Sequence, residues 1–122
     1  MDRKKILLIE DDNDIAKTTA AFLEMEGFEV VIASEGIDGL HKARTIKPDL
    51  VIIDIMLPTL DGFKICRMLK FDNNFKHLPV IIFTARAQEA DKKLGKEVCA
   101  DAYVTKPFDP EVLIGKIKEL LK

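Results

Sequence analysis

A short stretch in the middle of the chain decides the fold: Leu50-Val51-Ile52-Ile53-Asp54. Four consecutive apolar residues, rich in β-branched side chains, are typical of a strand that is buried on both faces, as in a parallel sheet. An acidic residue follows at once, at the end where the strands of such a sheet bind their ligands. The stretch therefore predicts a buried strand that presents Asp54 at its carboxyl end.

Similar apolar runs occur on both sides of this stretch. They lie at Ile6–Ile9, Val30–Ala33 and Val80–Phe83, with a weaker fifth run at Ala102–Val104. Between the runs, apolar residues recur with helical spacing. The expected helix faces are Ile15, Thr19, Phe22 and Leu23; Ile37, Leu40 and Ala43; Phe63, Cys66 and Leu69; Ala90, Leu94 and Val98 within Gln88–Val98; and Leu113, Ile117, Leu120 and Leu121. This alternation predicts an α/β fold, a (βα)5 doubly wound parallel sheet with helices on both faces.

Turn and cap residues agree with these boundaries. Asp12 or Asn13 can cap the first helix, and Gly27 follows that helix. Pro48 ends the second helix, Pro79 precedes the fourth strand, and Asp109-Pro110 starts the last helix. We expect Met25, Met56 and Met68 to be packing residues.

Length and composition suit one domain that covers residues 1–122. The chain has 122 residues, of which 48% are hydrophobic and 33% charged. Its net charge of −2, with dispersed basic residues, argues against direct binding to nucleic acid. No stretch resembles a signal peptide or approaches the roughly 18 apolar residues of a membrane span, so a cytoplasmic location and no membrane contact are expected. The cysteines, Cys66 and Cys99, lack the spacing of a zinc site and are expected to be reduced packing residues.

Acidic residues follow two of the predicted strands. Glu10, Asp11 and Asp12 come after the first strand and Asp54 ends the third. Because the carboxyl ends of parallel strands share one edge, these carboxylates should converge and repel one another unless a cation lies among them. Oxygen ligands of this kind suit Mg²⁺ or Mn²⁺. The sequence therefore predicts an acidic metal site.

Groups that can hold a phosphoryl group follow the other strands. Thr84 ends the fourth strand, and Thr105 and Lys106 follow the fifth. A hydroxyl and a fixed positive charge beside a metal are the groups that phosphoryl oxygens need. A carboxylate can itself be the nucleophile in phosphoryl transfer, and Asp54, at the end of the central strand, is the best candidate.

Together these pieces resemble the receiver domains of bacterial response regulators, from Lys4 to Lys122. The matching segments are Ile6–Asp12, Pro48–Pro58 with Asp61-Gly62, Thr84-Ala85, and Asp101–Phe108. The resemblance implies the flavodoxin-like strand order 2-1-3-4-5. It also implies that phosphorylation switches a signalling module, which is not an enzyme.

The resemblance carries roles to individual residues. It implies that Asp54 accepts the phosphoryl group, that Asp11 binds Mg²⁺ directly, and that Glu10 does so through water. The carbonyl of Met56 would complete the metal ligands, and Thr84 and Lys106 would contact the phosphoryl oxygens. Tyr103 would be the aromatic whose rotamer follows Thr84. A cis Lys106-Pro107 bond is also implied, and the run of three acids leaves a one-place ambiguity between Asp11 and Asp12.

The implied partners are a sensor histidine kinase or histidine phosphotransfer protein upstream, and a protein or output domain downstream. The downstream partner would bind the face formed by Gln88–Val98, the fifth strand and the helix from Asp109, and the family also allows a phosphorylation-dependent dimer. The chain could be a stand-alone receiver or part of a longer regulator.

Two other functions would each need residues that this sequence lacks at the required place. A phosphatase or phosphotransferase with an aspartyl-phosphate intermediate would need an acid/base two places after Asp54, where Met56 stands. A flavin carrier would need a phosphate-binding loop after the first strand, where the chain is acidic.

Two residues depart from expectation. Cys99 stands where the family usually has Gly. Gly115 lies inside the last helix, which it either makes less rigid or allows to pack closely against a neighbour.

Overall fold

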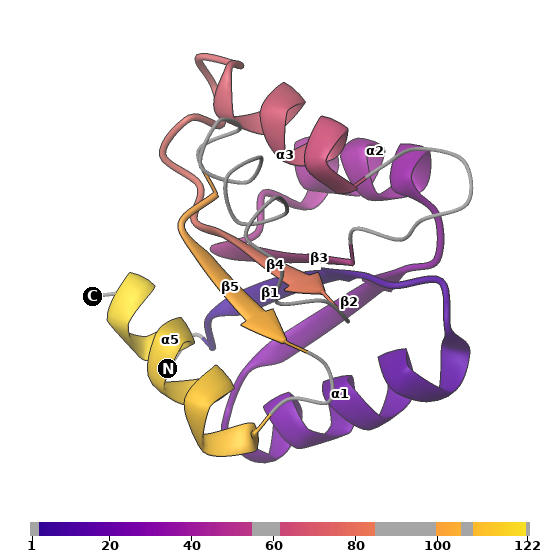
Figure 1. The fold of residues 1–122 in the computed structure, drawn as a ribbon. Helices are drawn as coiled ribbons and strands as arrows, with labels where there is room; N and C mark the ends of the chain where they lie inside the picture. The colour runs from indigo at the N-terminus through magenta and orange to yellow at the C-terminus, as the bar shows by residue number, and fades with distance from the viewer. Residues whose placement is uncertain (1–2, 55–61, 85–99, 106–108, 122) are drawn as a thin grey trace.

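The computed structural model describes residues 3–54, 62–84, 100–105 and 109–121. Within these residues, strands and helices alternate along the chain up to residue 84, as Figure 1 shows, and a fifth strand and a last helix follow after residue 100. The elements are β1 (Lys5–Ile9), α1 (Asn13–Met25), β2 (Glu29–Ala33), α2 (Gly36–Ile46), β3 (Leu50–Asp54), α3 (Gly62–Lys70), β4 (Val80–Thr84), β5 (Ala102–Thr105) and α5 (Pro110–Leu120). Each predicted strand is present and extends by no more than one residue at either end. The predicted helix Gln88–Val98 lies outside the described residues.

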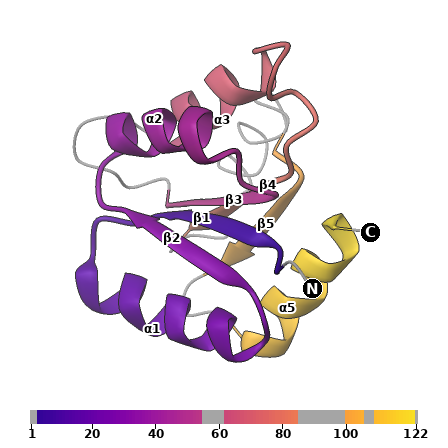
Figure 2. The same ribbon diagram turned by 180° about the vertical axis from the view of Figure 1, so that it is seen from behind.

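The five strands form one parallel sheet in the order β2-β1-β3-β4-β5, which confirms the predicted topology. Helices α2 and α3 cover one face, and α1 and α5 cover the other, as the two opposite views show (Figures 1 and 2). The chain changes faces after β2, between α1 and α2, and it then returns to pair β3 with β1, on the side of β1 away from β2. The carboxyl ends of β1 and β3 meet at the point where the strand order reverses.

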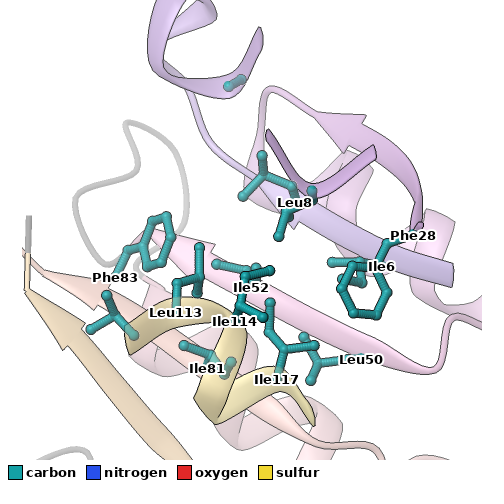
Figure 3. Packing of buried hydrophobic residues seen from close by; sticks show 13 residues of the cluster. Ile6, Leu8, Phe28, Leu50, Ile52, Ile81, Phe83, Leu113, Ile114 and Ile117 are labelled. Carbon is teal, nitrogen blue, oxygen red and sulfur yellow. The ribbon is translucent and has the colours of Figure 1, made fainter. Parts of the chain in front are cut away.

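Side chains of the central strands alternate between two cores. Leu7 and Ile9 of β1 face α2 and α3, whereas Ile6 and Leu8 face α1 and α5. Figure 3 shows the second core, in which Leu113, Ile114 and Ile117 of α5 pack against the sheet. Every residue of β3 is buried. Burying one such side chain contributes roughly 1.5–3 kcal/mol, so both faces of β1 and β3 stabilise the sheet.

Local capping sets the helix boundaries as predicted. The carboxylate of Asp12 accepts hydrogen bonds from the backbone N–H groups of Asp14 and Ile15, both at 3.0 Å, so Asp12 rather than Asn13 caps α1. Asp109 caps α5 in the same way through the N–H of Glu111, at 2.9 Å. Gly27, with φ of 96°, takes the positive φ that lets the chain leave α1.

Three apolar residues that were expected to pack in the interior are exposed. Met25 is 86%, Ile37 64% and Met68 47% exposed, so these predictions were wrong. A helix that covers a sheet buries only one stripe, and in α2 that stripe runs through Gly36, Gly39, Leu40 and Ala43. Ile37 lies about 100° around the helix from Gly36, outside the stripe. Met56 lies outside the described residues.

Other predictions about packing are settled by the same structure. Cys66 is completely buried, as expected of a packing residue, whereas Cys99 lies outside the described residues. Gly115 is exposed, and no described residue lies within 4 Å of the position that a Cβ would take there, so it does not serve close packing against the described parts of the chain. None of the described helices is long and apolar enough to cross a bilayer.

Candidate phosphoryl-accepting and metal site

Two acidic residues lie at the same level of the two central strands. Ile9 of β1 pairs with Ile53 of β3, and the next residue of each strand is acidic, Glu10 and Asp54 respectively. The backbone N–H of Glu10 donates to the carbonyl of Ala33 on β2, at 2.9 Å. The sheet backbone therefore brings Glu10 and Asp54 side by side at the switch point.

Asp11 completes a cluster of three carboxylates. Glu10, Asp11 and Asp54 each offer an oxygen, and these oxygens all lie within 4.8 Å of one another. Glu10 is only 1% exposed and Asp54 only 6%, whereas Asp11 is exposed. The cluster is thus closed on the side of the sheet and open to solvent at Asp11.

This arrangement fits a hard divalent cation. Two unit negative charges 4 Å apart repel by roughly 4 kcal/mol at an effective dielectric constant of 20, so three such charges at a mostly buried position favour a counter-ion. Carboxylate oxygens are the ligands that Mg²⁺ uses in proteins, usually with several waters retained. The open side at Asp11 is where such waters would lie. The donor set therefore suits Mg²⁺.

Asp12 has a different task from Asp11. Its Oδ1 accepts two N–H groups of the first turn of α1, and its own N–H lies 3.4 Å from Oε2 of Glu10. The helix cap thus occupies Oδ1 of Asp12, and Asp12 is not one of the three carboxylates that lie within 4.8 Å of one another. Geometry separates two neighbouring acids that the sequence could not separate.

The remaining predicted site residues are only partly described. Thr84 is the last residue of β4 and pairs with Thr105, while Asp54 pairs with Phe83. Tyr103 pairs with Ile82 and is half-buried against the core on the α2–α3 face. The side chain of Thr84, the residues Met56 and Lys106, and the Lys106-Pro107 bond lie outside the described residues. The backbone register alone places Thr84 one residue beyond the partner of Asp54.

One residue that the sequence analysis did not single out contacts the strand end that carries the site. Gly39 of α2 is buried against the side chain of Ile9, the residue before Glu10. A glycine on the buried face of a predicted helix was the available signal, since Gly costs roughly 1 kcal/mol there relative to Ala and usually has a packing reason.

Comparison with known proteins identifies the family. The response regulator receiver domain matches residues 6–118. The chain belongs to this family. The receiver is 41% identical over 119 residues to the alkaline phosphatase synthesis transcriptional regulatory protein PhoP of Bacillus subtilis, covering 98% of this chain and 49% of that protein. It is also 41% identical over 118 residues to the DNA-binding dual master transcriptional regulator RpaA of Synechocystis, covering 97% and 49%.

Solved structures agree with this assignment. The receiver domain of sensor histidine kinase PA1611 from Pseudomonas aeruginosa, which holds a magnesium ion in its active-site cleft, superposes with a TM-score of 0.90 at 27% identity and covers 98% of each chain. Phosphorylation on an aspartate and binding of Mg²⁺ are general features of response regulator receivers. This chain is therefore a receiver domain of two-component signalling.

The chain spans about half the length of the curated relatives it matches. The sequence predicted that the protein does not bind nucleic acid. The relatives do not support that prediction, because RpaA is a DNA-binding regulator.

Proposed function

We propose that Asp54 is the phosphoacceptor of this receiver. The observation that supports this role is its position: it ends the central strand, is 6% exposed, and has oxygens of Glu10 and Asp11 within 4.8 Å. A nucleophile at the switch point of a parallel sheet is reached from the carboxyl edge, where the site is open at Asp11.

The reaction transfers a phosphoryl group from a phosphohistidine. An oxygen of Asp54 forms a bond to phosphorus, the bond from phosphorus to the imidazole nitrogen breaks, and the nitrogen keeps its electron pair. The product is an acyl phosphate on Asp54 and a free histidine on the donor. The donor is a sensor histidine kinase or a histidine phosphotransfer protein, which fits a cytoplasmic location.

The acidic residues hold the metal in this proposal. Asp11 and Asp54 would hold Mg²⁺ directly and Glu10 through water, and the carbonyl of Met56 would complete the protein ligands. Mn²⁺ has the same preference for oxygen ligands and can replace it. When bound there, such a cation would neutralise charge on the incoming phosphoryl group. Thr84 and Lys106 contact the phosphoryl oxygens from the neighbouring strand ends.

Phosphorylation then changes the balance between two conformations. We assign the switch to Thr84 and Tyr103, and the output to the face formed by Gln88–Val98, β5 and α5. A partner protein or an output domain binds that face, or a second receiver does so in a phosphorylation-dependent dimer. Residues 1–122 act as a single response regulatory domain, which does not itself catalyse turnover of a substrate.

Acetyl phosphate tests the phosphoacceptor. With Mg²⁺ present, intact mass measurement should show one added phosphoryl group that hydroxylamine removes, and Asp54→Ala should abolish the addition. Asp12→Ala is the matched control, because it removes a nearby carboxylate that caps α1, and it should still be labelled. Labelling of Asp54→Ala to the same extent as the native receiver would show that another residue is the acceptor.

A further inference from the structure

A groove opens at the edge of the sheet opposite the phosphoacceptor. It measures about 820 Å³ and lies between the end of α2 and the segment that leads from α3 to β4. Pro48 and Asp49, just before β3, and Leu78 and Pro79, just before β4, line it. Its volume lies within the range of about 300–1,000 Å³ typical of ligand sites. Because it lies at the amino ends of the strands, it is separate from the cluster at Glu10 and Asp54.

Two basic residues line the groove without ion-pair partners. Arg44 and Lys47 are both exposed, and neither forms an ion pair with any residue in the described parts of the chain. Other lysines do form such pairs, for example Lys42 with Asp38 at 3.0 Å and Lys70 with Asp101 at 2.6 Å. Arg44 and Lys47 are therefore available to bind a carboxylate from outside.

Two aspartates of the same groove each accept a backbone hydrogen bond through one carboxylate oxygen. Oδ2 of Asp49 accepts the backbone N–H of Lys5 at 2.7 Å, and Oδ1 of Asp72 accepts that of Asn74 at 2.8 Å. A carboxylate has two oxygens and can accept several hydrogen bonds, so each aspartate can still accept an N–H donor. Between these polar groups, Pro48, Phe75, Leu78 and Pro79 supply apolar surface.

Lys47 stands in a strained conformation at the rim. It follows the last residue of α2 with φ of 49° and ψ of 66°, the left-handed region, and it directly precedes Pro48. Glycine is the usual residue at this position of a helix, because a side chain there costs roughly 1–2 kcal/mol. Strain that the chain tolerates at a ligand-sized groove points to a use for the side chain.

We propose that this groove binds an extended polypeptide segment that carries an acidic side chain next to an apolar one. Arg44 and Lys47 pair with the carboxylate, Asp49 and Asp72 accept backbone N–H groups, and the apolar side chain packs on Phe75 and Leu78. A polyphosphate or nucleic acid fits less well, because its phosphates would meet Asp49 and Asp72 as well as the two basic residues, whereas the backbone N–H groups of a peptide can donate to these aspartates.

NMR titration tests the proposal with defined probes. The probe is acetyl-Gly-Leu-Glu-Leu-Glu-Gly amide, and the comparison ligands are the same peptide with Gln in place of both Glu, and adenosine triphosphate. The acidic peptide should shift the amide signals of residues 44–49 and 72–78, and the Gln peptide should bind more weakly. Larger shifts there with adenosine triphosphate than with the acidic peptide, or no shifts with the peptide, would overturn the proposal.

Variants separate binding from helix capping. Arg44→Gln and Lys47→Gly should each lower the affinity for the acidic peptide roughly two- to fivefold, which is the range that one exposed ion pair contributes. Lys47→Gly should at the same time raise the urea midpoint, because it removes the left-handed side chain. Lys76→Gln is the matched control, an exposed lysine of the same segment that does not line the groove, and it should bind like the native chain. If Lys47→Gly changed stability alone, Lys47 would be a helix-end residue only and the proposal would fail.

Discussion

Gly39 of α2 lies directly against Ile9 of β1, so close that a Cβ at Gly39 would stand 2.7 Å from Cγ1 of Ile9 and closer still to Cδ1. Ile9 is completely buried and directly precedes Glu10. The absence of a side chain at Gly39 therefore sets how closely α2 approaches the strand that presents the acidic cluster.

Alanine at two glycines should have opposite effects. Gly39→Ala should lower the free energy of unfolding by up to about 2 kcal/mol, because roughly 1–3 kcal/mol of overpacking is offset only by about 1 kcal/mol gained in helix propensity. Gly115→Ala, with open space around it in α5, should raise it by about 0.5–1 kcal/mol. Urea denaturation followed by circular dichroism measures both. Stabilisation by both variants would mean that the side chain of Ile9 can move away from a Cβ at Gly39 with no loss of folding free energy.

Lys70 should matter for stability more than an exposed lysine does. Its ammonium lies 2.6 Å from Oδ2 of Asp101 and donates to the carbonyl of Leu78 at 2.8 Å, and its side chain is only 9% exposed. The same Asp101 oxygen accepts the N–H of Val80 at the start of β4, at 2.8 Å. Lys70→Met should therefore cost about 1–3 kcal/mol, since it leaves two acceptors without this donor.

Lys5→Met is the control for that measurement. Nζ of Lys5 lies 3.8 Å from Oε2 of Glu29, and the two side chains are 34% and 48% exposed. The loss in free energy of unfolding should therefore stay within about 0.5 kcal/mol. Equal losses in the two variants, measured by urea denaturation, would show that burial of Lys70 adds nothing to the ion pair.

Magnesium should stabilise the receiver through Asp11 and not through Asp12. At 100 times its dissociation constant, a ligand of the folded state adds about 2.7 kcal/mol to the free energy of unfolding. Asp11→Asn should remove most of this increment, because it takes one carboxylate from the cluster of three. Asp12→Asn should keep it, since asparagine caps a helix about as well as aspartate. Thermal unfolding with and without Mg²⁺ measures both, and equal losses would place Asp12 in the site.

Thr84→Ala should uncouple phosphorylation from the conformational response. The proposed switch requires the Thr84 hydroxyl to move toward the phosphoryl group and the Tyr103 ring to take up the space left behind. Amide spectra with and without beryllofluoride should therefore show large changes around Tyr103 and α5 in the native receiver and small ones in Thr84→Ala. A coupling of this kind typically changes affinity roughly 5- to 150-fold. Thr45→Ala, an exposed threonine of α2, should respond like the native chain. The same large changes in Thr84→Ala would rule out the Thr84-linked mechanism.

The sequence by itself determined the strands, their burial and the edge at which the acidic residues gather. A run such as Leu50–Ile53 is readable because a strand buried on both faces must be apolar throughout, and a parallel arrangement follows from the helices between strands. The position of Asp54 at a strand end then places it at the ligand-binding edge. Helix caps such as Asp109 can also be predicted from the sequence, because their hydrogen bonds join residues only two or three places apart.

Only the tertiary structure decided which groups meet across elements. Asp11 joins Glu10 and Asp54 while Asp12 caps α1, a distinction that depends on how the chain turns after β1. Ile37 and Met68 are exposed because the stripe that a helix buries depends on how it lies on the sheet, not on its hydrophobic residues alone. The contact of Gly39 with Ile9 and the groove beside Lys47 likewise join residues distant in sequence. Such contacts arise from the packing of whole elements, whereas periodicity in the sequence reports only the local backbone.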